Sequence, residues 1–234
     1  MTLQLPQIGF EQWTAASSGW AGPTSGLVNR WPLDNANISG SVATDVIGGN
    51  NGTIHGTVTS ATGPQGTDTC RQFDGITGYI SCSSMLAVAA APVSFFCWGY
   101  FTATPSLYQP FVSFRNASGV WYGLGIWDGT LDIAAGSDVA ALMRSTGSLA
   151  TGTWLHLGFT YDGTTLICYR NASSVSTTQD AGWANNYGNS QYTMMAFLKT
   201  SNSTWYYNNG RLKQVVAYNR ALSSAEVTQL YGAY

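Results

Sequence analysis

The amino-acid sequence predicts an all-β protein, a sandwich or a barrel, that ends in a short C-terminal helix. From about Leu27 onward, short runs of β-branched and aromatic residues alternate with clusters of turn residues. Asn-Gly and Asp-Gly pairs, which favour tight turns, separate these runs at positions 51–52, 74–75, 128–129, 162–163 and 209–210. Many short strands at such spacing are typical of sandwiches and barrels.

Two segments carry most of the local information. The run Val93–Phe101 is apolar at nearly every position, which predicts a central strand that is covered on both faces. Near the C-terminus, Ser223 and Glu226 have the spacing of a capping box, in which each side chain bonds to the backbone of the other residue. The apolar residues that then recur on one helical face are Val227, Leu230 and Tyr231. These residues predict the closing helix.

The chain of 234 residues fits one large all-β domain as well as two small ones. Residues 1–25 contain apolar and aromatic residues without strand alternation, followed by a run rich in Gly, Ser and Pro. We interpret them as an N-terminal arm that packs on a partner or on its own domain, and a partly disordered leader is the alternative. Residues 26–234 are predicted to form a single sandwich domain.

Composition restricts the partners of the protein. Charged residues make up only 9% of the chain and aromatic residues 13%, and a surface rich in hydroxyl and amide groups suits proteins that meet sugars or other subunits. The net charge of −2 excludes a broad electrostatic footprint for nucleic acid. No apolar stretch reaches about 18 residues, so no membrane span is expected. The N-terminus also lacks the basic and apolar regions of a signal peptide.

The four cysteines lack the C-x-x-C spacing of metal sites. Cys97 and Cys168 lie in apolar runs, where a free cysteine behaves as a small hydrophobic residue. Cys70 and Cys82 flank a predicted hairpin that would place them on neighbouring strands. A Cys70–Cys82 disulfide is therefore an alternative, although pairing requires a geometry that the sequence does not show.

Several motifs occur in the same order as in one known family. They are Trp31–Asp34 with Asp45 and the Gly/Asn-rich loop 49–53, Phe73–Gly75 with Tyr79–Ile80, Trp154–Gly163, and Tyr218–Ser223 with Glu226. Together, over residues 27–234, they resemble the laminin-G-like domains of the concanavalin A-like lectin/glucanase kind, and the C-terminal motif is the most specific. The resemblance implies a two-sheet antiparallel jelly-roll sandwich with a short C-terminal helix, which is the predicted fold class.

The resemblance also raises the question of calcium, because domains of this family often bind Ca²⁺ near the closing strand and the first loop. Asp34 and Asp45, with carbonyl groups around residues 48–51, are the candidate ligands. However, Lys213 and Gln214 stand in the closing strand where family members usually carry acidic residues. We therefore favour no cofactor, with Asp34 ending a strand and Asp45 opening a turn, and a calcium ion is the alternative.

The carboxylates argue against an enzyme. Glycoside hydrolases need two nearby carboxylates, but the chain has only two glutamates: Glu226 is explained by the capping box and Glu11 lies in the arm. The aspartates that precede a glycine are explained as turn formers, namely Asp74, Asp128 and Asp162. His55 and His156 give no better support to a Ser/His/Asp triad. We expect a non-enzymatic protein and keep a glycoside hydrolase as the least favoured alternative.

Two clusters of aromatic and amide residues lie in apparent loops and are the candidate ligand-binding residues. They are Trp183, Asn185, Asn186 and Tyr187 in the first cluster, and Trp205, Tyr206 and Tyr207 in the second. Exposed rings stack on sugar faces, and amide groups orient sugar hydroxyls. Loop aromatics also anchor subunit interfaces, so the sequence leaves both roles open.

Two functions are consistent with a non-enzymatic sandwich. The first is a virion structural protein, a capsid decoration or a tail-associated subunit, which accounts for the start of the chain, the N-terminal arm and the low charge. Its expected location is the virion, and its expected partners are other virion proteins or copies of itself, with cell-surface glycans as an additional ligand. The alternative is a lectin-like carbohydrate-binding module of a secreted, extracellular protein, which accounts for the fold and the loop aromatics.

Overall fold

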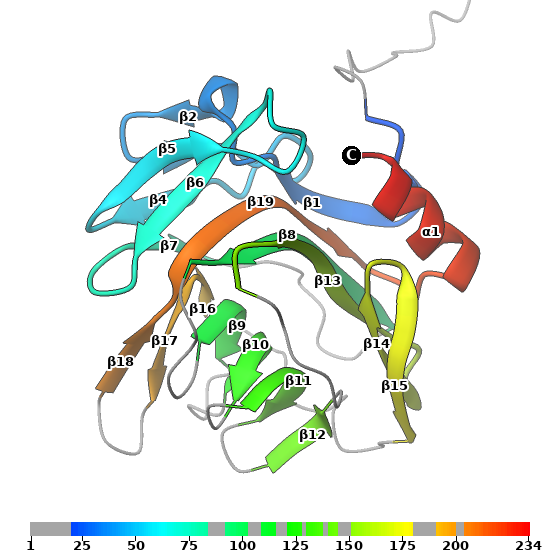
Figure 1. Cartoon of the computed structure of the whole chain (residues 1–234). Coiled ribbons are helices and arrows are strands. Elements are labelled where there is room, and N and C mark those ends of the chain that lie inside the picture. The colour runs from blue at the N-terminus through cyan, green and yellow to red at the C-terminus, as the bar shows by residue number, and fades with distance from the viewer. Residues whose placement is uncertain are drawn as a thin grey trace, which may run out of the picture.

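A computed structural model describes residues 20–83, 92–102, 109–115, 121–127, 130–137, 140–144, 151–179, 191–199 and 204–234. In these residues the chain forms a sandwich of two antiparallel sheets with one α-helix (Figure 1). The elements are β1 (Leu27–Trp31), the 3-10 helix η1 (Asn35–Asn37), β2 (Ile38–Ser39), β3 (Val42–Ala43), β4 (Gly52–His55), β5 (Val58–Thr62), β6 (Thr69–Asp74), β7 (Tyr79–Cys82), β8 (Val93–Phe101), β9 (Gln109–Arg115), β10 (Trp121–Trp127), β11 (Thr130–Ser137), β12 (Ala140–Arg144), β13 (Trp154–Tyr161), β14 (Thr165–Arg170), β15 (Ser173–Gln179), β16 (Gln191–Met194), β17 (Ala196–Lys199), β18 (Thr204–Tyr207), β19 (Asn209–Tyr218) and α1 (Ser224–Gly232).

The two sheets have the layered arrangement that the sequence predicts. The first sheet has the order β15-β14-β13-β8-β19-β6-β5, and β1 also pairs with β19. The second sheet has the order β12-β11-β10-β9-β16-β7-β4-β3-β2, and β17 and β18 form a separate hairpin. Neighbouring strands far apart in sequence, such as β8 and β19, run antiparallel. The predicted fold class, a two-sheet antiparallel sandwich with a short C-terminal helix, is confirmed.

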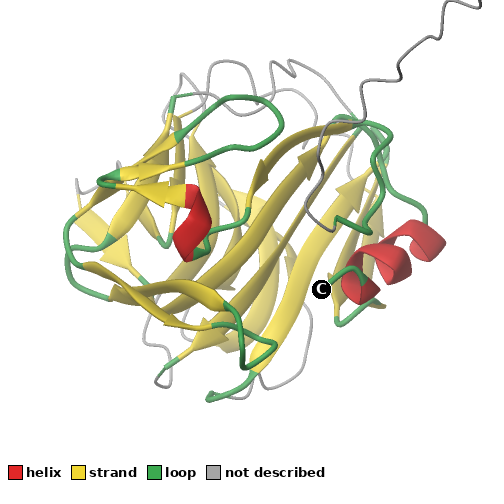
Figure 2. Ribbon diagram, turned by 90° about the horizontal axis from the view of Figure 1, so that it is seen from above, coloured by secondary structure: helices red, strands yellow, loops and turns green. Residues whose placement is uncertain are grey.

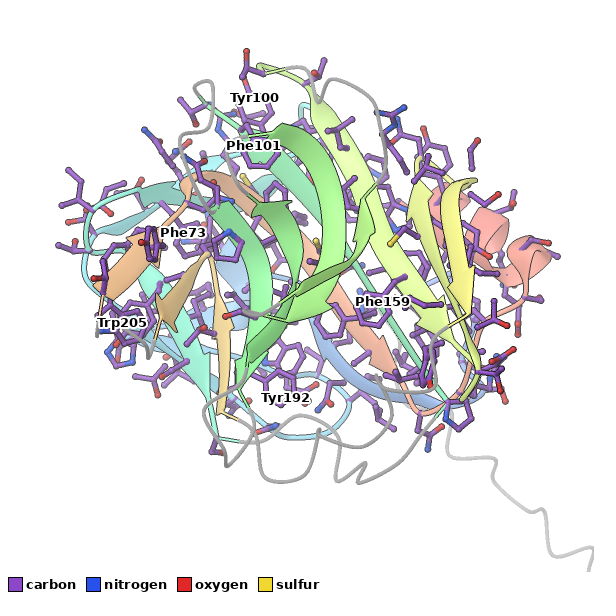
Figure 3. The ribbon with its side chains drawn as sticks, turned by 90° about the horizontal axis from the view of Figure 1, so that it is seen from below. Phe73, Tyr100, Phe101, Phe159, Tyr192 and Trp205 are labelled. Atoms are coloured by element: carbon purple, nitrogen blue, oxygen red, sulfur yellow. The ribbon has the colours of Figure 1, made fainter. Side chains whose placement is uncertain are left out.

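The central strands of the first sheet, β8, β13 and β19, are buried on both of their faces. Side chains such as Phe95 and Phe159 fill the space between the sheets, where Figure 3 shows Phe159. A second apolar cluster lies under α1 and contains Phe96, Val216 and Tyr218, and Figure 2 shows the helix beside the outer face of this sheet. Because successive side chains of a strand point to opposite faces, β8 needs apolar residues on both. The prediction of a doubly covered central strand at 93–101 is confirmed.

A β-bulge in β19 changes which residues of this strand face the core between the sheets and which face α1. The register against β8 shifts between Lys213 and Val216, and Gln214 has a left-handed backbone with φ of 50°. Because a bulge adds one residue to one strand, the alternation of side chains is reset. Val215 packs between the sheets while Val216 packs under α1. Lys213 lies before the shift, on the same outer face as the helix.

The capping box at the start of α1 is confirmed. The Glu226 N–H donates to Ser223 Oγ at 3.3 Å, and the Ser223 N–H donates to Glu226 Oε2 at 2.9 Å. Arg220 Nη1 donates to Glu226 Oε2 at 2.9 Å. The Arg220 hydrogen bonds and the Ser223 backbone N–H lower the pKa of Glu226 to about 2. The carboxylate therefore holds the helix start to the closing strand.

Glu226→Ala should lower the free energy of unfolding by about 0.5–2 kcal/mol, as the loss of a helix cap does, and should leave ligand binding unchanged in the folded protein. The folded-state pKa of about 2 lies below the ordinary value of 4.5, so the contribution is fully present above pH 4.5 and is lost as the pH falls toward 2. Urea unfolding measured across this pH window should show the difference from wild type shrinking. Glu226→Gln keeps a cap acceptor and should lose less, and a pH-independent difference would contradict this account.

The Phe73–Ile80 segment departs from the prediction. It was expected to be a hairpin, but β6 belongs to the first sheet and β7 to the second. Asp74 Oδ1 accepts the N–H groups of Ile76, Thr77 and Gly78 at 2.8–2.9 Å, and this turn leads the chain from one sheet to the other. The predicted hairpin is therefore wrong, although the turn at Asp74 is present.

The alternative of a Cys70–Cys82 disulfide is also wrong. Cys70 lies in β6 and Cys82 in β7, which are strands of different sheets, and all four cysteines are free and buried. Burial raises the pKa of the Cys82 thiol to about 12, so it stays neutral and acts as a small apolar side chain.

The last residues of the predicted arm, 20–25, pack on the sandwich itself. Trp20 lies against the cluster under α1, with the Arg30 guanidinium 4.4 Å from its ring centroid. The Pro23 carbonyl accepts from Tyr218 Oη at 3.0 Å, and the Ala21 carbonyl accepts from Gln229 Nε2 at 3.0 Å. Residues 1–19 lie outside the described part of the chain. Among the described helices, none is long and apolar enough to cross a membrane.

Candidate functional site

A row of hydroxyl side chains crosses the outer face of the second sheet. Thr53 in β4 pairs with Ser81 in β7, Ser81 pairs with Thr193 in β16, and Thr193 pairs with Ser113 in β9. Their chain neighbours on the opposite face are buried core residues: Ile80, Val112 and Met194. Because side chains alternate along a strand, all four hydroxyls point away from the core. The register of four strands therefore creates a polar stripe that no single strand contains.

Aromatic rings form a wall beside this stripe. His55 of β4 and Tyr79 of β7 are cross-strand partners, and their rings stack at 4.4 Å with an interplanar angle of 11°. Trp205 of β18 lies 5.0 Å from the Tyr79 ring and 5.9 Å from the ring of Tyr207. The Trp205 side chain is 37% exposed and lies at the outer edge of the molecule (Figure 3). We call His55, Tyr79, Trp205 and Tyr207 the aromatic wall.

The β17–β18 hairpin brings Trp205 and Tyr207 to this place. Met195 has φ of 65° and turns the chain out of β16, while its N–H donates to the Phe111 carbonyl at 2.9 Å. Asn208 follows β18 beside Met195 at the base of the hairpin, and its N–H donates to the Met195 carbonyl at 2.8 Å. It is fully buried, and its Nδ2 donates to the Pro110 carbonyl at 3.0 Å. The base of the hairpin is therefore tied to β9 through both of its strands.

The stripe and the wall enclose a groove of about 460 Å³, which falls within the range of small-molecule sites, about 300–1,000 Å³. It is lined by Asn51, Thr53, His55, Tyr79, Ser81, Cys82, Ser83, Tyr192, Thr193 and Trp205. None of these ten lining residues is an aspartate, a glutamate, a lysine or an arginine. His55 Nε2 lies 2.8 Å from Ser81 Oγ, which fixes the ring over the stripe. The groove thus combines ring faces with hydroxyl, amide and imidazole groups.

Two ionisable groups at the aromatic wall, Tyr207 and Asp74, have shifted pKa values. Burial, together with Tyr79 and Asp74, raises the pKa of Tyr207, so its phenol remains a hydrogen-bond donor. Burial also tends to raise the pKa of Asp74, but the N–H groups of Thr77, Ile76 and Gly78 outweigh it and hold that pKa well below its usual range. Asp74 therefore stays ionised and accepts the N–H groups of the turn that follows it.

The structure gives the predicted calcium ligands separate protein partners. Asp45 is 4% exposed, and its two oxygens accept five hydrogen bonds. The donors are Asn29 Nδ2 and the backbone N–H groups of Arg30, Ile47, Gly48 and Asn50, at 2.6–3.1 Å. Asp34 caps η1 by accepting from the Asn37 N–H at 3.0 Å and from Asn37 Nδ2 at 2.7 Å.

The candidate ligand-binding residues divide into three groups. Trp205 and Tyr207 belong to the aromatic wall, whereas Tyr206 lies between them and so faces the other side of β18. Trp183, Asn185, Asn186 and Tyr187 lie outside the described residues. The loop predicted for the second cluster is wrong, because residues 204–207 form β18 and Asn209 begins β19.

Sequence reasoning missed most of the groove. In the sequence, Tyr79, Ser81 and Thr53 belong to predicted strands or motifs, and His55 is a candidate only for a catalytic triad. The signal that could have found them is alternation: YISC and GTIH place polar or aromatic residues at every second position, between buried or partly buried neighbours. What alternation alone does not give is which strands are neighbours.

The comparisons with known proteins agree with this architecture. The family model described as concanavalin A-like lectin/glucanases superfamily matches residues 74–228. Domain 4 of AbnA, an extracellular arabinanase of family GH43 from Geobacillus stearothermophilus solved in complex with arabinotriose, is 19% identical with a TM-score of 0.69, and the match covers 89% of this chain and all of that one. A search of curated proteins finds no sequence that matches.

Two further structures are similar over only part of their length. Trypanosoma rangeli sialidase in complex with sialic acid is 17% identical with a TM-score of 0.65, over 89% of this chain and 33% of that one. The binding domain of Paraclostridial Mosquitocidal Protein 1 is 14% identical with a TM-score of 0.64, over 89% of this chain and 52% of that one. At these identities the likeness concerns the fold. Since the family model matches about two thirds of the sequence, the chain belongs to the concanavalin A-like lectin/glucanase superfamily.

Proposed function

We propose that this protein binds carbohydrate in the groove of the second sheet and does so without catalysis. The observation that carries the proposal is the position of the aromatic wall, with Trp205 partly exposed, directly beside hydroxyl groups from three strands. A sugar ring has a face of C–H groups and a rim of hydroxyls. An aromatic wall next to a polar stripe matches both of these features.

The wall and the stripe have separate tasks in this proposal. The exposed ring of Trp205, supported by Tyr79 at 5.0 Å, takes the apolar face of a sugar and gives large contact area with little loss of conformational freedom. The hydroxyls of Thr53, Ser81 and Thr193 meet the sugar hydroxyls. Thr193 Oγ1 already donates to the Ala196 carbonyl at 2.6 Å, so it acts as an acceptor toward the sugar. Specificity then comes from a few placed polar groups, as in other small-molecule sites.

The relatives favour the same class of ligand. The arabinanase domain was solved with arabinotriose and the sialidase with sialic acid. The match covers the whole of the first chain and a third of the second. These ligands belong to those proteins, and they supply the first sugars to test here.

The carboxylates that the structure describes have structural tasks, which supports binding without hydrolysis. Glu226 caps α1, Asp74 and Asp162 accept N–H groups in turns, and Asp45 accepts five donors in its loop. None of these residues lines the groove. Hydrolysis of a glycosidic bond needs a pair of carboxyl groups on either side of it.

Trp205→Ala should weaken sugar binding about 30-fold or more, because truncating a central aromatic contact costs about 2 kcal/mol or more. Isothermal titration calorimetry with arabinotriose, xylo- and malto-oligosaccharides and sialyllactose tests the wild type and the variant. Tyr206→Ala is the matched control, since it removes a ring from the same strand on the opposite face, and it should bind as wild type does. Equal losses in both variants would mean that the groove is not the site.

Thermal unfolding of both variants separates a damaged hairpin from a lost contact. If Trp205→Ala unfolds near the wild-type temperature and no longer binds, the ring acts in binding. If the wild type binds no member of the sugar panel and no member of a wider glycan array, the proposal is wrong. Product analysis after long incubation with each oligosaccharide tests for hydrolysis, which we expect to be absent.

A virion structural role, with other virion proteins or copies of this chain as partners, stays a prediction from the composition and the N-terminal arm. The groove is compatible with either location, a virion or a secreted protein, because both would present it to external glycans. Mass spectrometry of purified virus particles decides between the two locations. A virion protein should be present in the particles at a fixed copy number.

A further inference from the structure

The ammonium group of Lys213 is enclosed by oxygen atoms on the outer face of the first sheet. Lys213 Nζ lies 2.5 Å from the Thr69 carbonyl oxygen, 3.2 Å from Asp68 Oδ2 and 3.8 Å from Asp34 Oδ2. Its side chain is only 4% exposed. The ring of Tyr234 covers it, with 5.3 Å between Nζ and the ring centroid. We call Asp34, Asp68 and the Thr69 carbonyl the oxygen cage.

The oxygen cage joins three segments that are distant in sequence. Asp34 follows β1, Asp68 and Thr69 lie where β6 begins, and Lys213 comes from β19. The bulge after Lys213 leaves this residue on the outer face, where the cage lies. The remaining oxygens also have protein partners: Asp34 Oδ1 accepts from Asn37 at 2.7 Å, and Asp68 Oδ1 accepts from the Gln65 N–H at 3.0 Å. The ammonium is thus the cation at the centre of this contact.

The residues at this place do not fit a calcium ion. Carboxylate and carbonyl oxygens are the ligands that Ca²⁺ prefers, and the cage contains both kinds. However, the position between them is taken by a covalently attached positive charge, and a second cation a few ångströms away would be repelled. Asp45, the other predicted ligand, has both oxygens committed to five donors. This chain therefore departs from the calcium binding that its resemblance implies.

We propose that the Lys213 ammonium is a built-in replacement for a divalent cation, and that the oxygen cage becomes a calcium site when this ammonium is removed. The protein then needs no calcium to join β1, β6 and β19. The inference is independent of the sugar groove, which lies on the second sheet. It concerns the stability of the fold, and it is tested without any sugar.

The sign of each effect follows from the charges. Without Lys213, the Asp34 and Asp68 carboxylates and the Thr69 carbonyl lose the cation that contacts all three, and removal of one partner of a buried ion pair is strongly destabilising. Arg30 and Arg71 still interact electrostatically with Asp34, and Tyr234 Oη still donates to Asp68 Oδ2. A divalent ion that binds the folded state alone restores stability by mass action. Because wild type already has its cation, added calcium should leave its stability unchanged.

The test is thermal unfolding of wild type, Lys213→Ala and Lys213→Met. Each protein is measured in EDTA, in about 1 mM Ca²⁺, which is the range of weak extracellular sites, and in NaCl of equal ionic strength. We expect no calcium effect on wild type. Both variants should unfold at lower temperature in EDTA and should recover at least several degrees in calcium but not in NaCl. Lys213→Ala leaves space for an ion with water, so its recovery should exceed that of Lys213→Met.

Three results would overturn the proposal. The first is a rise of the wild-type unfolding temperature in calcium that Asp34→Asn removes, because the ion would then bind beside Lys213. The second is that calcium does not raise the unfolding temperature of either Lys213 variant. If the variants are unfolded in EDTA, the equivalent result is that neither regains its near-ultraviolet circular dichroism signal when calcium is added. The third is an unchanged calcium response when Lys213→Ala is combined with Asp34→Asn and Asp68→Asn, because the ion would then bind elsewhere.

Discussion

Asp45→Ala is expected to lower the free energy of unfolding by about 3–5 kcal/mol, because five donors lose their acceptor together and a buried donor left without one costs about 1–3 kcal/mol. Asp45 is 4% exposed and accepts five donors from the 29–50 region. Four of these donors are partly buried backbone N–H groups, which water reaches only in part. Urea unfolding with an unchanged m value would show a loss of stability rather than a changed unfolded state.

Asp162→Ala is the matched control for this prediction. Asp162 also accepts two backbone N–H groups, from Thr164 and Thr165 at 2.8 and 2.7 Å, but it lies in an exposed turn. Water replaces the lost acceptor there, so we expect a loss of about 1 kcal/mol or less. A loss at Asp45 no larger than the loss at Asp162 would mean that the loop is not held by its carboxylate.

The same loop reaches the groove, which links stability to binding. The Asp45 N–H donates to Asn51 Oδ1 at 2.9 Å, and Asn51 lines the groove. A folded Asp45→Ala protein should therefore bind sugar more weakly than wild type, although Asp45 itself lines no part of the groove. Calorimetry at a temperature where the variant is folded measures this effect separately from unfolding.

Phe159→Ala is expected to cost about 3–5 kcal/mol, the usual range for truncating a buried phenylalanine. Phe159 is fully buried between the sheets (Figure 3), and its ring stacks on Phe95 at 6.4 Å. The truncation leaves a cavity that a rigid sandwich closes only in part. Phe159→Leu fills much of that cavity and should cost clearly less.

The two core variants also test the separation of core and site. The groove lies on the outer face of the second sheet, away from Phe159, so the folded fraction of Phe159→Ala should bind sugar as wild type does. Chemical denaturation and calorimetry together give both quantities. A large loss of affinity at full folding would show that the sheet spacing controls the groove.

Part of the candidate site could be predicted from the sequence. Trp205 and Tyr207 were chosen because aromatic and amide residues cluster there, and both belong to the aromatic wall. Tyr79 and His55 were not chosen, because in sequence each is one aromatic residue within an ordinary strand. They contribute to the aromatic wall because their rings stack on each other at 4.4 Å, and this contact depends on the pairing of β4 with β7.

Local signals in the sequence determined many elements of this fold by themselves, although they predicted a loop where residues 204–207 form β18. Alternating apolar residues specify strands, turn pairs separate them, and Ser223 with Glu226 caps the helix, because each of these depends on residues within a few positions of one another. The two apolar faces of β8 likewise required a layer on each side.

Only the tertiary structure decided which of these elements meet. It set β6 and β7 in different sheets, joined Thr53, Ser81 and Thr193 into one stripe, and enclosed Lys213 in oxygens of Asp34, Asp68 and Thr69. The physical reason is that strand register and sheet order are fixed by the packing of the whole core. Contacts between residues more than a hundred positions apart, such as Thr69 with Lys213, follow from that packing and from no local pattern.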